Sequence, residues 1–438
     1  MVKRFIRSGL LTISFLLSVL ASFRGGYVGP DYYTHLARII EWPKIFDFGA
    51  TNPPLYYLLG HGLFRIIGPS NALPITLSII QASVNIAALW WFFVRVERRF
   101  LSPLIYVGLV GLLTLLPVRI IHAATIGTDC TTIPLFVLVL FLLNKFSSDE
   151  TSTQKNAAFL GLALSLSVFT KYSFIALLPV VLGVFVWIGK KRGWKLGRFA
   201  GICAISLAFP SAITAYSFWA SNQVHGYNTE KHWARDGIPA DMDYKDLFAI
   251  KANDIQLLKA PEYFKRDILA PHKYSYLGLS HFGVFTDPMN LFQDLSVPQR
   301  FGGILIPDQK TRRPWKTTVM EISILLGTVW TFLALLGTPW SFVRGLRHLF
   351  KDKLELEDNG ILLGTAYFLL MFLPIPFVHG GALFGYWTPR LILPALLCFF
   401  LAGFLLVDRR LVTKSRSIAF VLLALVAVQS ATEILMLI

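Results

Sequence analysis

The chain has 438 residues, of which 55% are hydrophobic and 15% charged, and its mean hydropathy is +0.58. These values exclude an ordinary soluble domain and indicate an integral membrane protein. The formal net charge of +16 does not indicate a nucleic-acid partner, because the basic residues fall in short blocks between apolar runs and not along one soluble face.

The apolar runs predict an all-α polytopic membrane protein. A basic start followed by an apolar run resembles a secretory signal, but many further apolar segments follow, so we expect a retained first span. Measured against about 20 residues for one span, the runs predict about eleven transmembrane helices. They lie at 5–23, 73–94, 103–121, 131–144, 157–170, 173–189, 199–219, 319–342, 361–378, 389–407 and 417–437.

The basic clusters predict the orientation, because Lys and Arg are retained on the cytoplasmic side. Every cluster falls on one side of the predicted topology, so we expect a cytoplasmic N-terminus in a plasma (inner) membrane. The clusters are Lys3–Arg7, Arg95 with Arg98 and Arg99, Lys145 with Lys155, residues 190–198, Arg344 with Arg347, Lys351 and Lys353, and residues 408–416.

The same topology divides the chain into three parts. Residues 1–219 form a transmembrane module of about seven spans with a first external loop at 24–72, and 319–438 form a second module of about four spans. Between them, 220–318 carries both charge signs and several Pro and Gly residues. We interpret it as a folded external loop, too small for a catalytic domain but large enough to cover a site.

Soluble-enzyme motifs are absent from the sequence. There is no Walker loop, no GxGxxG between strand and helix, and no HExxH zinc pair. The cysteines, Cys130, Cys203 and Cys398, lie far apart and give neither a disulfide framework nor metal-ligand spacing.

Two carboxylates are expected at the external membrane surface. Asp31 begins "DYYTHLARIIEW" in the first external loop, where apolar residues at helical spacing predict a short interfacial helix. Asp129, in "RIIHAATIGTDCTTIPLF", stands just outside the fourth span. The alternative is that each only caps a helix. The apolar residues of the short helix are Tyr33, Leu36, Ala37 and Ile40.

Two cations are expected at the same depth, Lys171 in "SVFTKYSFIALLPV" and Arg390 in "GYWTPRLILPALLCFF". Ionisable groups bordering spans usually have a partner or a task. The alternative is that each is a snorkelling anchor. His379 has no comparable support and is interpreted as an interfacial histidine.

This set of groups suits the transfer of a sugar from a lipid phosphate to an acceptor hydroxyl. A carboxylate takes the acceptor proton, and a cation neutralises charge on the departing phosphate. Aromatic side chains offer faces for the sugar and the prenyl chain, although most of them also suit an interfacial aromatic belt. The candidate substrate-binding residues, besides the two cations, are His35, Tyr56, Tyr57 and Tyr386.

"TNPPLYYLLGHGLFRIIG" at 51–68 resembles the "PPLYY" element of the GT-C superfamily of polytopic glycosyltransferases, which includes protein O-mannosyltransferases and the aminoarabinose transferases of lipid A. The order of the loop aspartate, "GTDCTTIPLFVLVLFLL", "FTKYS" and "YWTPRLILPAL" is similar to the same group. The resemblance implies that Asp31 is the catalytic base and that Lys171 and Arg390 contact the donor phosphate. It implies that Asp129 organises the acceptor or the first loop.

The resemblance further implies a polyprenyl-phosphate-linked sugar donor, surrounding membrane lipids, and a glycan, lipid or protein acceptor. Asp31 is followed by Tyr instead of a second acid, and Asn52 replaces the basic residue common before the prolines. A divalent metal therefore lacks a clear ligand set, and no cofactor is expected. The rival hypothesis is a lipid or glycan transporter or flippase, a class that tends to show internal repeats and midplane sites; a non-catalytic scaffold would leave the clustering unexplained.

Overall fold

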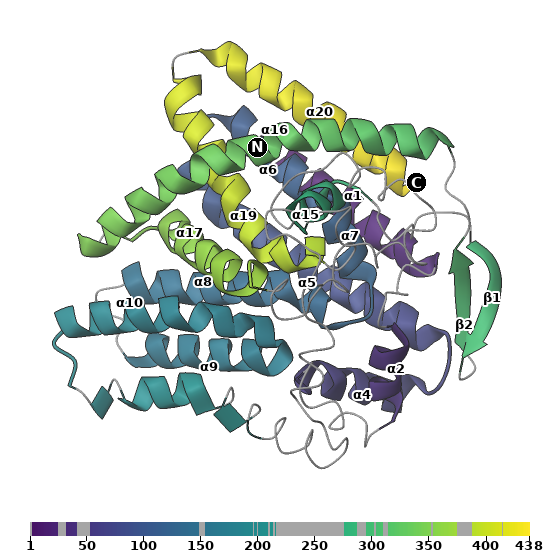
Figure 1. Cartoon of the computed structure of the whole chain (residues 1–438), viewed down its shortest axis with the longest axis horizontal. Helices are drawn as coiled ribbons and strands as arrows, with labels where there is room; N and C mark the ends of the chain where they lie inside the picture. Colours follow the sequence, from purple (N-terminus) through teal and green to yellow (C-terminus); the bar gives the residue numbers. More distant parts are fainter. Residues whose placement is uncertain are drawn as a thin grey trace, which may run out of the picture.

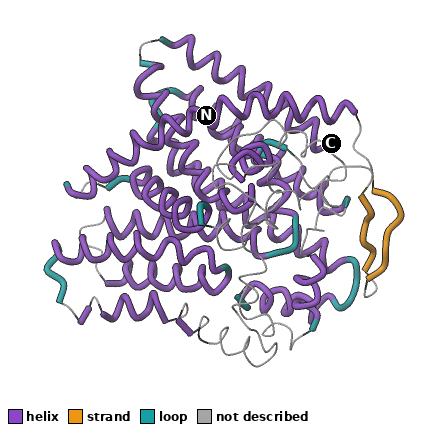
Figure 2. Tube along the Cα trace, viewed as in Figure 1, coloured by secondary structure: helices purple, strands orange, loops and turns teal. Residues whose placement is uncertain are grey.

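The structure is a computed structural model, and its fold is a bundle of helices with one short β-hairpin at its edge (Figures 1 and 2). It describes residues 2–24, 32–41, 53–148, 154–195, 197–198, 200–208, 211–212, 215, 276–286, 295–301, 304–309, 314–351, 354–374, 388–413 and 415–438.

The first part of the chain forms helices joined by short 3-10 turns. The α-helices are α1 (Val2–Phe23), α2 (Tyr32–Ile40), α4 (Leu55–Ile67), α5 (Ala72–Val96), α6 (Pro103–Leu115), α7 (Pro117–Ala124), α8 (Thr132–Ser148), α9 (Gln154–Thr170) and α10 (Leu178–Lys191). The 3-10 turns are η1 (Glu97–Arg99), η2 (Thr128–Thr131) and η3 (Tyr172–Leu177).

The second part adds longer helices and the hairpin. Its α-helices are α15 (Tyr276–Val284), α16 (Pro314–Phe350), α17 (Leu356–Tyr367), α19 (Thr388–Val407) and α20 (Arg416–Leu437). The strands β1 (Leu295–Phe301) and β2 (Ile304–Gln309) pair antiparallel, and π-helical turns continue α17 as η6 (Phe368–Phe372) and α19 as η8 (Asp408–Val412).

The predicted polytopic helical architecture is confirmed, with the β-hairpin as an addition to it. Within the described residues, seven helices are long and apolar enough to cross a membrane, or eight if the pair α6 and α7, bent by 45°, forms one span. The bend falls at Pro117, which cannot continue the hydrogen-bond ladder of α6. Predicted spans 157–170 and 361–378 correspond to α9, of 17 residues, and α17, of 12 residues, which are too short to count among the seven. Predicted span 199–219 is described only in part. The total of eleven stays a prediction.

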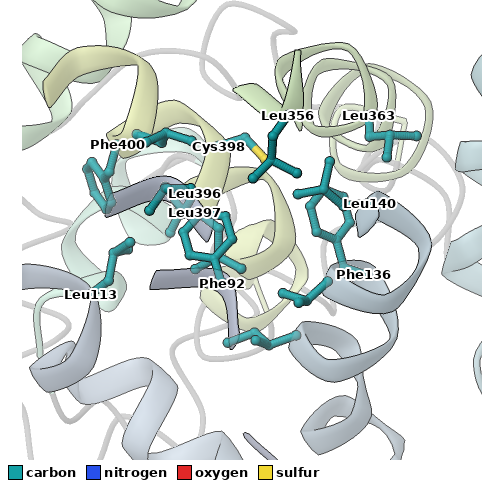
Figure 3. Close-up of a cluster of buried hydrophobic side chains, with 14 of the residues drawn as sticks. Phe92, Leu113, Phe136, Leu140, Leu356, Leu363, Leu396, Leu397, Cys398 and Phe400 are labelled. Carbon is teal, nitrogen blue, oxygen red and sulfur yellow. The ribbon is translucent and has the colours of Figure 1, made fainter. Parts of the chain in front are cut away.

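The bundle core surrounds α19, which lies between α16, α17 and the N-terminal helices (Figure 1). Large apolar side chains from α5, α6, α8, α17 and α19 meet there (Figure 3). Helices α16 and α19 approach at two glycines: a Cβ on Gly337 would lie 2.4 Å from the backbone nitrogen of Gly403, and one on Gly403 would lie 2.7 Å from the Leu333 carbonyl oxygen. Small residues of this kind let membrane helices pack backbone to backbone.

Part of the predicted external loop 220–318 packs inside the bundle. Helix α15 lies against α19 and α16, and the Tyr276 hydroxyl donates a hydrogen bond to the Phe372 carbonyl oxygen at 2.7 Å. The hydroxyl of Ser323 in α16 donates a hydrogen bond at 2.7 Å to the carbonyl oxygen of Phe285, the residue just after α15. This segment therefore contributes to the interior as well as forming the β-hairpin.

Most of the basic clusters meet at one end of the bundle, which we call the basic end. Arg7 of α1 contacts Glu97 of η1 at 2.6 Å, so the start of α1 lies beside the end of α5. Arg192 lies just after α10, and its guanidinium donates a hydrogen bond to the carbonyl oxygen of Phe146 in α8 at 3.2 Å. Basic clusters that the predicted topology only placed on the same side of the membrane therefore lie on segments that contact one another.

An ion network at the basic end is centred on the first turn of α17. The carboxylate of Glu357 accepts contacts from Arg409 at 2.9 Å, Arg99 at 3.3 Å and Arg344 at 3.4 Å. The adjacent Asp358 is fully buried and contacts Arg344 at 3.0 Å. Several of the basic residues therefore have structural partners as well as a topological meaning.

Replacing Glu357 by Gln should destabilise the protein markedly. The change leaves three guanidinium groups without the carboxylate between them, and removing one partner of a buried ion pair costs about 3–5 kcal/mol. The shift in the unfolding midpoint of the detergent-solubilised protein measures this loss of stability. Glu355→Gln is the matched control, because the Glu355 side chain is 42% exposed and an exposed pair contributes about 0–1 kcal/mol. Equal shifts in both variants would contradict the network.

Candidate active site

The candidate site lies at the end of the bundle opposite the basic end, where α5 begins; we call it the site end. The connection between α7 and α8 is held against α5 by two polar side chains. Ser78 Oγ donates to the Ala124 carbonyl at 2.5 Å, and Asn85 Nδ2 donates to the Cys130 carbonyl at 2.7 Å. Together with Gln81, these residues recur at helical spacing, which places them on one face of α5.

Asp129 and Lys171 form an ion pair at this end. Asp129 lies in η2, and Lys171 joins α9 to η3. Their side chains are 13% and 11% exposed, so the pair is largely removed from water. The sequence placed both residues at the same depth, and the structure brings their charged groups into contact.

Helix α2 forms where the sequence predicts it, but its buried face matches the predicted apolar stripe only in part. Leu36 of that stripe is fully buried, whereas Ala37 and Ile40 are only partly buried. The buried face also carries His35 at 4% exposure and Arg38 at 0%. Helix α4 packs on α2 (Figure 1). These two polar side chains contact aromatic residues of α4.

Tyr57 of α4 is the partner of both polar side chains. His35 Nδ1 lies 2.7 Å from the Tyr57 hydroxyl oxygen, and the two rings stack with centroids 5.7 Å apart. The Arg38 guanidinium carbon lies 4.8 Å from the Tyr57 ring centroid, a cation–π contact that is strong when desolvated. The Tyr57 ring is fully buried. The ring packs against His35 and Arg38, and the expected contact of Tyr57 with a substrate stays a prediction.

Tyr56 joins α4 to α5 and to the turn before η2. Its hydroxyl accepts hydrogen bonds from Gln81 Nε2 at 2.5 Å and from the Gly127 backbone N–H at 3.0 Å. Burial, with added effects of Cys130 and Tyr57, raises the pKa of Tyr56 well above its usual value of 10.0. The hydroxyl therefore stays protonated, and because both acceptor positions are used, its proton can serve as a donor.

Gly127 connects this aromatic cluster to the ion pair, because it lies two residues before Asp129 and contacts His35. A Cβ at Gly127 would lie 2.9 Å from His35 Nε2 and 3.1 Å from its Cδ2. His35 Nδ1 is in contact with the Tyr57 hydroxyl, so a side chain at Gly127 would press on a ring that already has a partner.

Gly127→Ala should therefore displace His35 and reduce activity at this site. Overpacking of this kind costs typically about 1–3 kcal/mol, and we expect a lower unfolding midpoint together with reduced sugar transfer. Gly62→Ala in α4 is the matched control, because a Cβ there would meet nothing within 4 Å. Wild-type transfer and stability in Gly127→Ala would show that the contact does not constrain the site.

The other predicted site residues are not described to the same extent. Asp31 and Tyr386 lie outside the described residues, as does His379, which was interpreted as an interfacial histidine. Arg390 is in the first turn of α19, and its side chain is outside the described part. The described structure thus brings together Asp129 with Lys171, and His35 with Tyr56 and Tyr57. Within the described residues, no group of three or more His, Cys, Asp or Glu side chains could hold a metal ion.

Sequence reasoning did not select Arg38, Gln81 and Asn85 as site residues. Gln81 and Asn85 carried a usable signal, since they are polar, four residues apart and inside a predicted span. Arg38 carried none, because an arginine on a short loop helix is ordinarily solvated.

Comparison with known proteins gives a limited result. No family model and no curated protein matches the sequence. Among solved structures, the chain is similar to ArnT from Cupriavidus metallidurans bound to undecaprenyl phosphate, with a TM-score of 0.38 and 12% identity over 92% of this chain and 77% of that chain. The apo state of the same protein gives a TM-score of 0.35 and 13% identity, covering 92% of this chain and 76% of that one. Scores this low do not establish a shared activity, so the function is inferred from residues of this chain.

Proposed function

We propose that the protein is a membrane glycosyltransferase that transfers a sugar from a polyprenyl-phosphate-linked donor to a hydroxyl group of a glycan, lipid or protein acceptor. The observation that carries the proposal is the largely buried pair of Asp129 and Lys171 beside the cluster of His35, Tyr56 and Tyr57 at one end of a membrane bundle. Charged groups at such a position are costly and usually serve a task.

Lys171 supplies a cation for the donor phosphate. Its ammonium group is a compact positive charge that can donate to phosphate oxygens, and contact with Asp129 orients the group. A charge-assisted bond to phosphate is about twice as strong as a neutral one. Arg390 supplies the second cation, whose planar fork suits two phosphate oxygens. Asp129 is in this scheme a positioning residue for Lys171.

Asp31 is the proposed base that takes the proton from the acceptor hydroxyl. It directly precedes α2 in the sequence, and the next residue, Tyr32, is fully buried in the cluster formed by α2, α4 and the start of α5. The protonated Tyr56 hydroxyl adds a hydrogen-bond donor at the same end. No step in this scheme requires a metal or an organic cofactor.

Reconstituted protein tests the proposal directly. With a panel of polyprenyl-phosphate sugars in nanodiscs, we expect release of polyprenyl phosphate coupled to formation of a glycosylated acceptor. A parallel assay follows movement of the fluorescent donor lipid between leaflets of proteoliposomes. Lipid movement without cleavage of the sugar–phosphate bond would contradict the proposal and support a flippase.

The orientation is inferred from the one-sided basic clusters. A reporter fused after Arg99, Arg198 or Lys353 should be cytoplasmic, and one inserted near Gly237 should be external. The site end would then face the external side of the plasma (inner) membrane. An external signal from the Arg198 fusion would contradict this orientation, whereas an internal signal at Gly237 would contradict the placement of 220–318.

A further inference from the structure

A cavity of about 1500 Å³ lies at the basic end, around the last two turns of α5 and between α1, η1 and α8. Its lining is strongly basic. Within the described part of the chain, Glu97 is the one acidic residue in that lining. The basic residues are Arg4, Arg7, Arg95, Arg98, Arg99 and Lys145.

Within the described residues, four of the six cations have no carboxylate partner. Arg7 contacts Glu97 at 2.6 Å, and Arg99 contacts Glu355 at 2.9 Å. The other four form no ion pair with a carboxylate of the described residues, and all are exposed. They are Arg4, Arg95, Arg98 and Lys145.

These four charges come from α1, α5, η1 and α8 and line one cavity. Arg95 and Arg98 are three residues apart and therefore share a face of the chain at the end of α5. Lys145 lies in the last turn of α8, and Arg4 lies near the start of α1. Several exposed basic charges around one cavity produce a local positive potential that attracts an anion.

The wall of the cavity nearer the middle of the bundle is aromatic. Trp90 and Trp91 lie about one turn before Arg95 on α5, and Trp91 contacts Phe141 of α8 with ring centroids 4.1 Å apart. Tryptophan at this depth is typical of the membrane interface, where one side of the ring meets hydrocarbon and the other meets headgroups.

An exposed apolar stripe on α5 leads from the middle of the helix to this wall. Ile80, Val84 and Trp90 are 45%, 50% and 48% exposed. Ile80 and Val84 are four residues apart and share one side of the helix, and Trp90, six residues further on, is turned by about 120° from Val84, so the three form a broad apolar face. A hydrocarbon chain can lie along this stripe while a phosphate occupies the basic cavity. A soluble phosphate would use only the cations.

We propose that this cavity binds the headgroup of an anionic glycerophospholipid, with an acyl chain along the stripe on α5. Basic pockets between transmembrane helices bind lipid headgroups of this class. The site is distinct from the site end: Gln81 and Arg95 are separated by roughly 20 Å along α5. In the proposed orientation the lipid belongs to the cytoplasmic leaflet, but binding depends neither on that orientation nor on the transfer activity.

Lipid binding to the intact purified chain tests the proposal. Native mass spectrometry and thermal midpoints are measured with phosphatidylglycerol, with phosphatidylcholine, and with inorganic phosphate. We expect wild-type protein to retain phosphatidylglycerol and to be stabilised by it, with neither effect from phosphatidylcholine. Equal retention of both lipids would overturn the proposal, and this comparison needs no variant.

Charge variants locate the binding. A protein carrying Arg4→Gln, Arg95→Gln, Arg98→Gln and Lys145→Gln should bind phosphatidylglycerol at least about tenfold more weakly, since each basic residue near a membrane surface contributes measurably to anionic-lipid binding. The matched control removes the same number of exposed charges outside the cavity and should bind as wild type. Its changes are Lys190→Gln, Lys195→Gln, Arg410→Gln and Arg416→Gln. Equal weakening in both proteins would indicate a general surface effect and overturn the assignment to the cavity.

A variant in the apolar stripe distinguishes binding of a lipid from binding of a soluble anion. Val84→Gln should weaken phosphatidylglycerol binding and leave any competition by inorganic phosphate unchanged. If inorganic phosphate displaces the lipid at similar concentrations and Val84→Gln has no effect, the cavity is a site for a soluble anion and the lipid proposal fails.

Discussion

Asp31→Asn should lower sugar transfer by roughly 10²- to 10⁴-fold, the loss typical of removing a general base. Asparagine keeps the size and hydrogen-bonding shape of the side chain but cannot accept the acceptor proton. The amount of protein in the membrane and its unfolding midpoint should stay at wild-type values. Transfer from a polyprenyl-phosphate sugar is the measurement, with both other quantities recorded on the same samples.

Asp31→Ala is the companion variant. Asp31 directly precedes α2, so the alternative hypothesis is that it only caps this helix and has no catalytic role. Asparagine caps a helix about as well as aspartate, whereas alanine costs about 1 kcal/mol. Capping alone therefore predicts a silent Asn variant and a slightly destabilised Ala variant. Catalysis predicts that both are inactive. A fully active Asp31→Asn protein would contradict the assignment of the base.

Some of the membrane helices could be predicted closely from the sequence. Predicted spans 73–94 and 417–437 correspond to α5 (Ala72–Val96) and α20 (Arg416–Leu437). The bilayer requires long apolar helices with internally satisfied backbones, so the signal is strong. The prediction of 319–342 missed both ends of α16 (Pro314–Phe350). At its C-terminal end, Arg344 and His348 bond to Asp358, a partner that hydropathy does not show.

The sequence predicted at which membrane surface the site residues lie, but it did not predict their contacts with one another. The topology placed Asp129 and Lys171 at one surface, whereas their pairing depends on how η2 and η3 pack. The orientation of α2 was not accessible to a hydrophobic pattern either. His35 and Arg38 are buried because Tyr57 of α4 offers both a hydroxyl group and a ring face. Helix–helix recognition of this kind is set by partners distant in sequence.

Breaking the pair of Asp129 and Lys171 should have large effects on stability. Lys171→Met removes the cation that contacts the Asp129 carboxylate, and Asp129→Asn removes the anion that contacts the Lys171 ammonium. Loss of one partner of a buried pair costs about 3–5 kcal/mol. The double variant, Asp129→Asn with Lys171→Met, removes both charges and should recover most of the free energy of unfolding.

Transfer activity in the same three proteins separates a structural pair from a functional one. If the pair only stabilises the fold, the double variant should regain transfer along with stability. If Lys171 contacts the donor phosphate, the double variant should be stable but remain about 10²- to 10³-fold slower than wild type, because a donor that stabilises the transition-state charge is missing. Recovery of both properties would show that Lys171 is an anchor, and the donor phosphate would then have to be bound by other cations of the site end.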